Sequence, residues 1–378
     1  MAAPGTAPVQ MLGAVSAGTA TEDLLTAILR ANPRVSDLIF SPGRNLQVHV
    51  NGDLLSIGES GLPALTPDDT RRIASDLIGS NNAAINLLRE HGCCDISYAL
   101  PGIARFRANV FIQRGSCAIV MRVIPTVIPN FQSLGVPEQL REISDLYDGL
   151  ILITGPRGSG KSSTLAALLD YINETEARHI ITIEDPIEFL HNHKRSTVHQ
   201  RELHSDTPTF AEAMNAALRQ VPNLIAIGEL KDPQTMELAI QAAETGHVVL
   251  STLNTLSAQQ TVDRLVGAFS KSEQQVVRNR LARILRCLVS QRLVPRKVVP
   301  RKHDEGRTAV FEVMRSGSAE LEHLFDPETN FAADSNQSEI DSQIEDLVRA
   351  GIVTREIALA HALDARALAQ RLDIEANR

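Results

Sequence analysis

The spacing of apolar residues follows two different patterns, one before and one after about residue 150. From Leu150 onward, short apolar runs alternate with longer amphipathic segments, a pattern typical of a parallel sheet with crossover helices. The strands are expected at residues 151–154, 179–184, 224–228 and 248–253, and the helices at residues 163–173, 210–219, 234–244 and 258–269. The sequence therefore predicts an α/β unit with a parallel sheet.

The part before Leu150 mixes short strands and helices in another order. Strands are expected at residues 37–40, 46–50, 53–57, 95–99, 105–113 and 118–124, and helices at residues 21–32, 66–78 and 82–91. Asn51-Gly52 is a strong signal for a two-residue hairpin. We expect a separate mixed α/β domain of about 100 residues here.

The remaining segments are less regular. Three prolines in residues 125–137 indicate a linker, residues 272–288 are expected as one helix, residues 307–314 as a strand, residues 326–343 as a loop and residues 344–372 as one or two small helices. We divide the chain into a disordered lead (1–20), an N-terminal domain (21–124), a linker (125–140), a core domain (141–315) and a C-terminal loop with helices (316–378).

Composition narrows the functional classes. The 378 residues are 43% hydrophobic, enough for sizeable cores, and the net charge of −8 argues against nonspecific binding of nucleic acid. The chain has no Trp and only 3% aromatic residues, which disfavours a base-stacking single-strand binder. The arginines of the expected helix 272–288 are interpreted as a solvated or interface face rather than a nucleic-acid site; they are Arg278, Arg280, Arg283 and Arg286.

Cysteine use and the absence of long apolar runs bear on the compartment. Cys93, Cys94, Cys117 and Cys287 have neither C-x-x-C nor metal-site spacing, so we expect reduced thiols in a cytosolic protein. We find no apolar run near the roughly 18 residues of a membrane span. The first residues lack the basic segment of a signal peptide.

The most specific motif is a phosphate loop. Residues 155–162 fit G-x-x-x-x-G-K-[ST], with an apolar strand before and a helix after, which disfavours a chance glycine-rich turn. Lys161 supplies a charge for the outer phosphates of ATP, and the Ser162 hydroxyl is a hard ligand for Mg²⁺. The predicted nucleotide-binding residues are Gly155, Pro156, Arg157, Gly158, Ser159, Gly160, Lys161, Ser162 and Ser163.

Acidic residues follow two of the expected strands. In the segment IITIEDPIEF, Glu188 is a candidate to orient the attacking water or accept its proton, and Asp185 and Glu184 are close to it. In LIAIGELKD, Glu229 ends a strand and is a candidate to hold Mg²⁺ through water. The alternatives are that the first group caps a turn and that Glu229 faces solvent.

Basic candidates come from both halves of the chain. His247 precedes a strand and is a candidate sensor of the outer phosphate, although a single histidine is more often structural. Arg105, Arg107, Arg114 and Arg122 lie on or beside neighbouring strands of the first domain. Arginines often stabilise phosphate charge from a neighbouring subunit, and a solvated strand face is the alternative.

Together these residues resemble the secretion ATPase superfamily and, within it, the twitching-motility ATPases that retract type IV pili. The resemblance covers residues 22–315 and, more loosely, residues 344–372. It depends on separate blocks in one order: SDLIFSPG with VNGDL, GIARFRANVF, GPRGSGKSST, ITIEDPIEF, HQRELHSDT, ALRQVPNLIAIGELKD and AAETGHVVLSTLNT.

The resemblance implies a PAS-like N-terminal domain joined to a RecA-like ATPase core in a homo-hexamer, with ATP bound between one subunit's core and the next subunit's N-terminal domain. It implies that Lys161 and Ser162 hold phosphate and Mg²⁺, and that Glu188 is the general base. Glu229 matches the acid of the second phosphate strand and His247 the first histidine of a histidine block. Arg107 and Arg122 match arginines supplied across the subunit boundary.

The implied setting is cytoplasmic and peripheral at the inner membrane. The implied partners are the inner-membrane platform protein of the pilus machine, the pilin fibre behind it and possibly a sister motor ATPase, with no nucleic acid.

The sequence departs from the family pattern at several places. Asn254 stands where a second histidine is usual and cannot titrate, Arg157 replaces a usual Thr, and Lys231 replaces a usual Arg. The C-terminal Ala-Ile-Arg block is not recognisable, and residues 318–325 stand in its place. These departures keep open a weakly hydrolysing or accessory paralogue that modulates a sister motor. A type II secretion or pilus-extension ATPase ranks lower.

Overall fold

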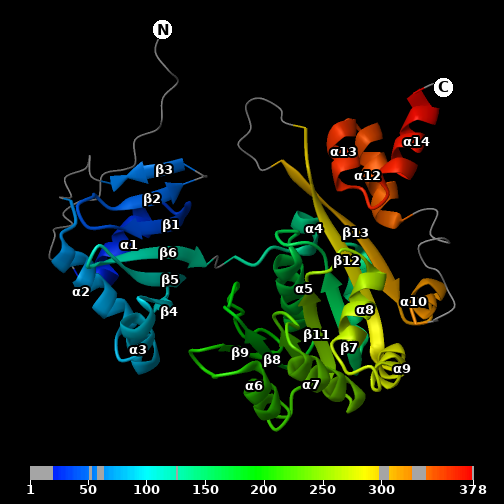
Figure 1. The fold of residues 1–378 in the computed structure, drawn as a ribbon, viewed down its shortest axis with the longest axis horizontal. Coiled ribbons are helices and arrows are strands. Elements are labelled where there is room, and N and C mark those ends of the chain that lie inside the picture. Colours follow the sequence, from blue (N-terminus) through cyan, green and yellow to red (C-terminus); the bar gives the residue numbers. More distant parts are fainter. Residues whose placement is uncertain are drawn as a thin grey trace. The chain divides into compact units, whose positions relative to one another are not determined.

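The computed structural model describes residues 20–50, 53–57, 64–124, 127–297, 306–325 and 338–376. Contacts within the chain divide it into two compact units, residues 1–126 and 127–378 (Figure 1). Residues 1–19 of the predicted disordered lead and the predicted hairpin turn at Asn51-Gly52 lie outside the described residues. None of the helices that the structure describes is both long and apolar enough to cross a membrane.

The first unit is an antiparallel sheet backed by helices. Its strands are β1 (Val35–Phe40), β2 (Gln47–Val50), β3 (Asp53–Ser56), β4 (Cys93–Leu100), β5 (Ala104–Gln113) and β6 (Ser116–Ile124), and its helices are α1 (Thr21–Ala31), α2 (Pro67–Ile78) and α3 (Asn82–His91). The strand order is β3-β2-β1-β6-β5-β4. Alternate residues such as Phe106 and Met121 are buried in the core with the helices, because successive side chains of a strand point to opposite faces.

The second unit is a sheet of seven described strands with helices on both faces (Figure 1). Its strands are β7 (Gly149–Thr154), β8 (His179–Glu184), β9 (Thr197–Glu202), β10 (Leu224–Ile227), β11 (Val248–Leu253), β12 (Leu285–Pro295) and β13 (Arg307–Arg315). The order is β13-β12-β7-β11-β10-β8-β9, and only β12 and β13 pair antiparallel. The predicted α/β class with a parallel sheet is confirmed.

The helices of this unit form two layers and a C-terminal group. They are α4 (Phe131–Leu134), the 3₁₀ helix η2 (Glu138–Asp145), α5 (Lys161–Thr175), α6 (Phe210–Ala217), α7 (Pro233–Glu244), α8 (Ala258–Gly267), α9 (Gln274–Ile284), α10 (Ala319–His323), α12 (Glu339–Arg349), α13 (Arg355–His361) and α14 (Ala365–Ala376). Leu150 of β7 packs with α6 to α9, whereas Ile151 packs with α4, η2 and α5. Burial on both faces explains why these strands are continuous apolar runs.

Part of the predicted linker is packed on the second unit. Residues 125–126 lie outside the described residues. Further along, Phe131, Leu140 and Ile143 are buried in the core that includes α5. By its contacts, the chain from Val127 onward belongs to the second unit.

The prediction of one helix over residues 272–288 is wrong in its last part. Helix α9 ends at Ile284 and β12 begins at Leu285 with no residue between them. The strand is held by pairing with β7 on one side and β13 on the other. Such tertiary pairing overrides a local helical pattern. Cys287 of this strand is buried, and all four cysteines are free, as predicted.

Two further elements differ from the sequence expectation. Strand β9 was not predicted, because its sequence TVHQRE is mostly polar, yet it pairs in parallel with β8 at the edge of the sheet. Residues 339–343 form the start of α12 rather than a loop, and residues 326–337 lie outside the described residues. Helices α12, α13 and α14 share a small core with β12 and β13, so three helices stand where one or two were expected.

Candidate active site

The phosphate loop leaves the sheet where buried β7 ends. It runs from Gly155 to Gly160, and α5 begins at Lys161. Gly155 and Gly160 have φ angles of 149° and 88°, which favour glycine. Because Gly160 at the N-cap has no side chain, the first N–H groups of α5 are left for an anion. The predicted nucleotide-binding residues from Gly155 to Ser163 therefore form one continuous turn and helix start.

Lys161 lies in this turn and is only 8% exposed. Its Nζ donates to the carbonyl oxygens of Gly155 and Pro156, both at 2.9 Å. Burial lowers the pKa of Lys161, whereas the negative charges of Glu229 and Glu188 raise it. The Lys161 ammonium group therefore feels the charges of both predicted carboxylates and also donates hydrogen bonds to the loop carbonyls.

Glu229 and Asn254 meet at the ends of adjacent strands. Glu229 follows β10, Asn254 follows β11, and these strands pair in parallel. The Asn254 side-chain amide donates to Glu229 Oε1 at 2.6 Å. The residue that replaces the family's second histidine therefore holds the predicted metal-site carboxylate in place.

The acidic block at the end of β8 is organised around Glu184. Its carboxylate accepts hydrogen bonds from Thr182 Oγ1 at 2.5 Å, from Gln200 Nε2 at 3.0 Å and from the Glu188 backbone. Burial raises the pKa of Glu184. Glu188 itself is exposed, so its carboxylate is accessible to water while its backbone is held.

The partner of Lys231 is also in this block. Lys231 Nζ forms an ion pair with Asp185 Oδ2 at 3.1 Å, between two partly exposed side chains. A lysine at this position therefore still links the end of β10 to the acidic block, through a single contact.

The structure does not bring His247 to this site. His247 precedes β11, whereas the loop follows the far end of the parallel strand β7, and the His247 carbonyl accepts from Gly149 at the start of β7. The His247 Nδ1 atom lies 3.1 Å from the Ala242 carbonyl oxygen at the end of α7. These contacts give His247 a structural role at the start of β11, at the strand ends opposite the phosphate loop.

Arg107 and Arg122 form a pair on the first unit. They are register partners on β5 and β6, and both are exposed. Arg122 Nε also donates to Asp37 Oδ1 of β1 at 2.9 Å. The two predicted arginines thus share one sheet face, as a trans-acting pair requires.

Sequence reasoning missed Gln291 of β12. This side chain is 3% exposed, donates to the Ser159 carbonyl at 2.8 Å and accepts from Thr164 Oγ1 at 2.8 Å. No motif in the sequence indicates this contact, because Gln291 follows the loop by more than a hundred residues.

The arginines of the predicted basic helix are paired within the chain. Arg280 contacts Glu237 and Glu244 of α7, each through two nitrogen–oxygen contacts between 2.8 and 3.0 Å. Arg286 contacts Asp148 at 2.6 Å. Arg280 of α9 and Arg286 of β12 therefore contact acids of their own unit, and the interpretation of these arginines as a solvated or interface face stays a prediction.

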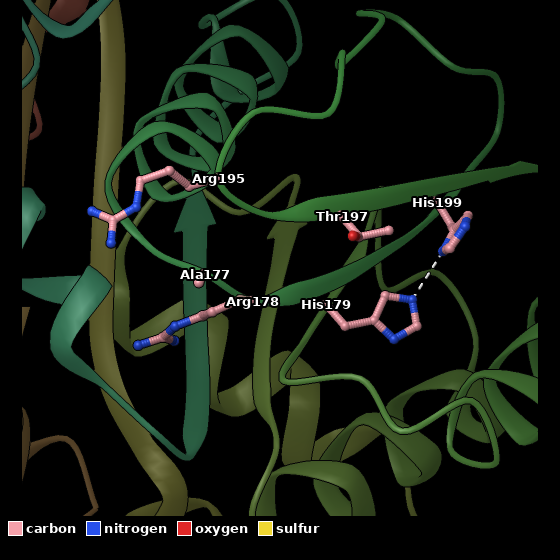
Figure 2. Close-up of a pocket in the computed structure, with 6 residues that line it drawn as sticks. All are labelled: Ala177, Arg178, His179, Arg195, Thr197 and His199. Atoms are coloured by element: carbon pink, nitrogen blue, oxygen red, sulfur yellow. Dashed lines mark hydrogen bonds between the residues drawn. The ribbon is translucent and has the colours of Figure 1, made fainter.

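A cavity of about 410 Å³ lies by the first residues of β8 and β9. In Figure 2, Arg178 and Arg195 extend to one side, while His179 and His199 lie on the other and contact each other at 2.9 Å. Arg178 also donates to the Leu146 carbonyl at 2.7 Å. The charged groups do not converge, and the cavity lies away from the phosphate loop.

The residues at the loop fit a nucleotide with Mg²⁺. The uncapped start of α5 and the Lys161 ammonium suit phosphate oxygens, and Ser162 and Glu229 offer hard oxygen ligands. Among the described residues, no group of three or more His, Cys, Asp or Glu side chains is arranged to hold a metal alone. Mg²⁺ is commonly bound through few protein oxygens together with phosphates and waters.

Comparison with known proteins places this geometry in a family. A family model for "Type II/IV secretion system protein" matches residues 96–359. The type IV pilus retraction ATPase PilT of Pseudomonas aeruginosa is 42% identical over 284 residues, covering 75% of this chain and 79% of that protein. A twitching motility protein of Neisseria gonorrhoeae is 36% identical over 329 residues, covering 85% of each.

A solved structure agrees with these matches. The crystal structure of the pilus retraction motor PilT with bound ADP superposes with a TM-score of 0.82 at 37% identity, covering 92% of this chain and 98% of that one. The resemblance drawn from the sequence blocks is thereby confirmed, and this chain belongs to the type II/IV secretion system protein family.

Proposed function

We propose that this chain is a Mg²⁺-dependent ATP hydrolase that powers the retraction of type IV pili. The observation that carries the proposal is the phosphate loop itself, with buried Lys161 at the start of α5 and with Glu229 and Glu188 following the paired parallel strands β10 and β8. The names of the pilus retraction and twitching-motility relatives support the cellular role.

The side chains divide the work of hydrolysis. Lys161 and the α5 N-terminus bind the outer phosphates, and Ser162 and Glu229 would hold Mg²⁺, which would supply charge neutralisation. Glu188 orients a water molecule and accepts its proton as the water oxygen bonds to the terminal phosphorus and the bond to ADP breaks. Asn254 keeps Glu229 oriented. His247 has no part in this scheme.

The assembly we propose is a homo-hexamer at the cytoplasmic face of the inner membrane. In it, Arg107 and Arg122 of one subunit serve the nucleotide of its neighbour. Their exposure and shared register support this role. The motor acts on the inner-membrane platform protein of the pilus machine, without contact with nucleic acid.

An accessory, weakly hydrolysing paralogue is the second candidate. Asn254 favours it, because an amide at this position cannot carry the charge of a histidine. Under this hypothesis, the chain binds ATP and modulates a sister motor rather than driving retraction itself.

Two measurements test the proposal. Glu188→Gln is expected to lower ATP turnover about a hundredfold or more without loss of nucleotide binding, because a general base contributes at least that factor. Lys161→Ala is expected to abolish tight binding. If the Glu188→Gln protein turned over ATP as fast as the parent, hydrolysis at this site would be contradicted.

The cellular arm uses a deletion strain. Pili that extend but fail to withdraw are expected for a retraction motor. Pili that still withdraw, but with less force or less often, would instead favour the accessory role.

A further inference from the structure

The side chain of Gln291 forms hydrogen bonds with one residue before Lys161 and one residue after it. Its Nε2 donates to the Ser159 carbonyl, two residues before Lys161, and its Oε1 accepts from Thr164, three residues after it. Because the Ser159 carbonyl can only accept, the Gln291 amide must turn its Nε2 donor toward Ser159, which leaves Oε1 to accept from Thr164. Both contacts are buried, where hydrogen bonds are not exchanged with water.

The bond to Ser159 sets the direction of the next N–H group. In a trans peptide unit, the C=O and the N–H point in opposite directions. Since the Ser159 carbonyl is turned toward Gln291, the Gly160 N–H of the same peptide is turned away from β12. Such outward-turned N–H groups are what a phosphate loop presents to its anion.

The strand around Gln291 also explains two glycines of the motif. A Cβ on Gly155 would lie 2.2 Å from the Gln291 carbonyl oxygen, and one on Gly160 would lie 2.9 Å from Gln291 Nε2. The first contact is with backbone and leaves no room for a side chain at Gly155, whereas a side chain at Gly160 would displace the Gln291 amide. The loop therefore packs against this one residue of β12 through both backbone and side chain.

We propose that Gln291 is a positioning residue for nucleotide binding, acting through the Ser159–Gly160 peptide rather than by touching the nucleotide. The inference rests on the proposed nucleotide site but not on hydrolysis. Gln343 offers a matched control, because its amide donates to the Phe311 carbonyl at 2.6 Å and accepts from the Phe311 N–H at 3.0 Å, away from the loop. Phe311 is the register partner of Gln291 on β13.

The test compares Gln291→Met, Thr164→Val and Gln343→Met by ADP affinity, kcat, KM and melting temperature. Gln291→Met is expected to raise the Kd for ADP and the KM for ATP roughly tenfold, as the loss of about one well-placed hydrogen bond implies. Its kcat should change far less, because the contact supports ground state and transition state alike. Thr164→Val should show a smaller rise of the same kind, and Gln343→Met none.

Two outcomes would overturn the proposal. One is a Gln291→Met protein that binds ADP like the parent, and the other is a Gln343→Met protein that loses affinity equally. If Gln291→Met does not fold, an unchanged Kd for Thr164→Val decides against it. ADP binding without ATP turnover in the parent would contradict the proposed ATPase but leave the Gln291 comparison intact.

Discussion

Single carboxylates in this site are held by hydrogen bonds from neighbouring side chains. Glu229 is fixed by the Asn254 amide, and the acidic block is fixed through Glu184. Asn254 can donate a hydrogen bond to a carboxylate as a histidine does, but its amide does not change protonation state near neutral pH. The hydrogen bond to Glu229 is present at this position, whereas the charge that a histidine can carry is not.

Replacing Asn254 tests that view. Asn254→Ala is expected to lower kcat about tenfold, because the orientation of Glu229 is then lost. Asn254→Asp should lower it further, since a second carboxylate would repel Glu229. Steady-state ATPase assays at saturating ATP measure both. An Asn254→Asp enzyme as fast as the parent would show that the contact has no role in turnover.

The sequence predicted those residues that belong to a contiguous motif. The phosphate loop could be recognised because its glycines, Lys161 and Ser162 are adjacent in the chain. Gln291 could not, since its two partners lie 132 and 127 residues earlier. His247 was a candidate from residue type and resemblance, although in a parallel sheet a residue that precedes β11 lies at the strand end opposite the loop that follows β7.

Among the elements, α7 and α9 are joined by ion pairs of two arginines, Arg280 and the more exposed Arg283. Arg280 is 18% exposed and bridges Glu237 and Glu244 of α7. Its hydrogen bonds lower the pKa of Glu244 below the ordinary value of 4.5. Because the pKa is lowered, ionised Glu244 contributes to the free energy of unfolding above about pH 4.5. This contribution is lost as the pH falls through the lowered pKa and Glu244 becomes protonated.

Arg280→Met is therefore expected to cost about 2 kcal/mol of unfolding free energy near neutral pH, because it removes two hydrogen bonds from each of Glu237 and Glu244. The parent should lose this advantage as the pH falls below the ordinary glutamate value, so the two melting temperatures should converge. Thermal unfolding across pH measures it. Arg283→Met should cost much less, because its contact with Glu244, at 3.9 Å, is made by a side chain that is 73% exposed. A constant difference at all pH values would contradict the ion-pair explanation.

Elements were predictable where one amphipathic pattern ended before the next began. The four strands around the loop were each bounded by polar or glycine residues. The junction of Ile284 and Leu285 has no such boundary, so the helical pattern ran on into β12. β9 has little apolar pattern because an edge strand is supported from one side only.

At the scale of the whole molecule, the candidate groups belong to two units. The loop and its carboxylates are in residues 127–378, whereas Arg107 and Arg122 are in residues 1–126. A subunit that supplies arginines to a neighbour needs such a division. The sequence indicated both units, but their cooperation in an assembly stays a prediction.

Mixing two inactive variants tests this division of labour. Lys161→Ala and the double variant Arg107→Ala with Arg122→Ala are each expected to lose turnover by a hundredfold or more, as loss of a phosphate-binding arginine does. Their mixture should regain part of the rate, because some interfaces then combine an intact loop with intact arginines.

The control is Arg114→Ala, an exposed arginine at the β5–β6 turn, which should retain parental turnover. A mixture that is no more active than its two components would exclude sharing between subunits.

The burial of Cys287 gives β12 a native chemical reporter. Its surroundings raise the pKa of the thiol to about 12, so almost no reactive thiolate exists at neutral pH while the strand stays paired with β7. Alkylation of this sulfur must wait for the strand to separate, whereas exposed Cys93 reacts without such a delay. The labelling rate of Cys287 therefore counts how often the support behind the phosphate loop opens, without any introduced dye or mutation.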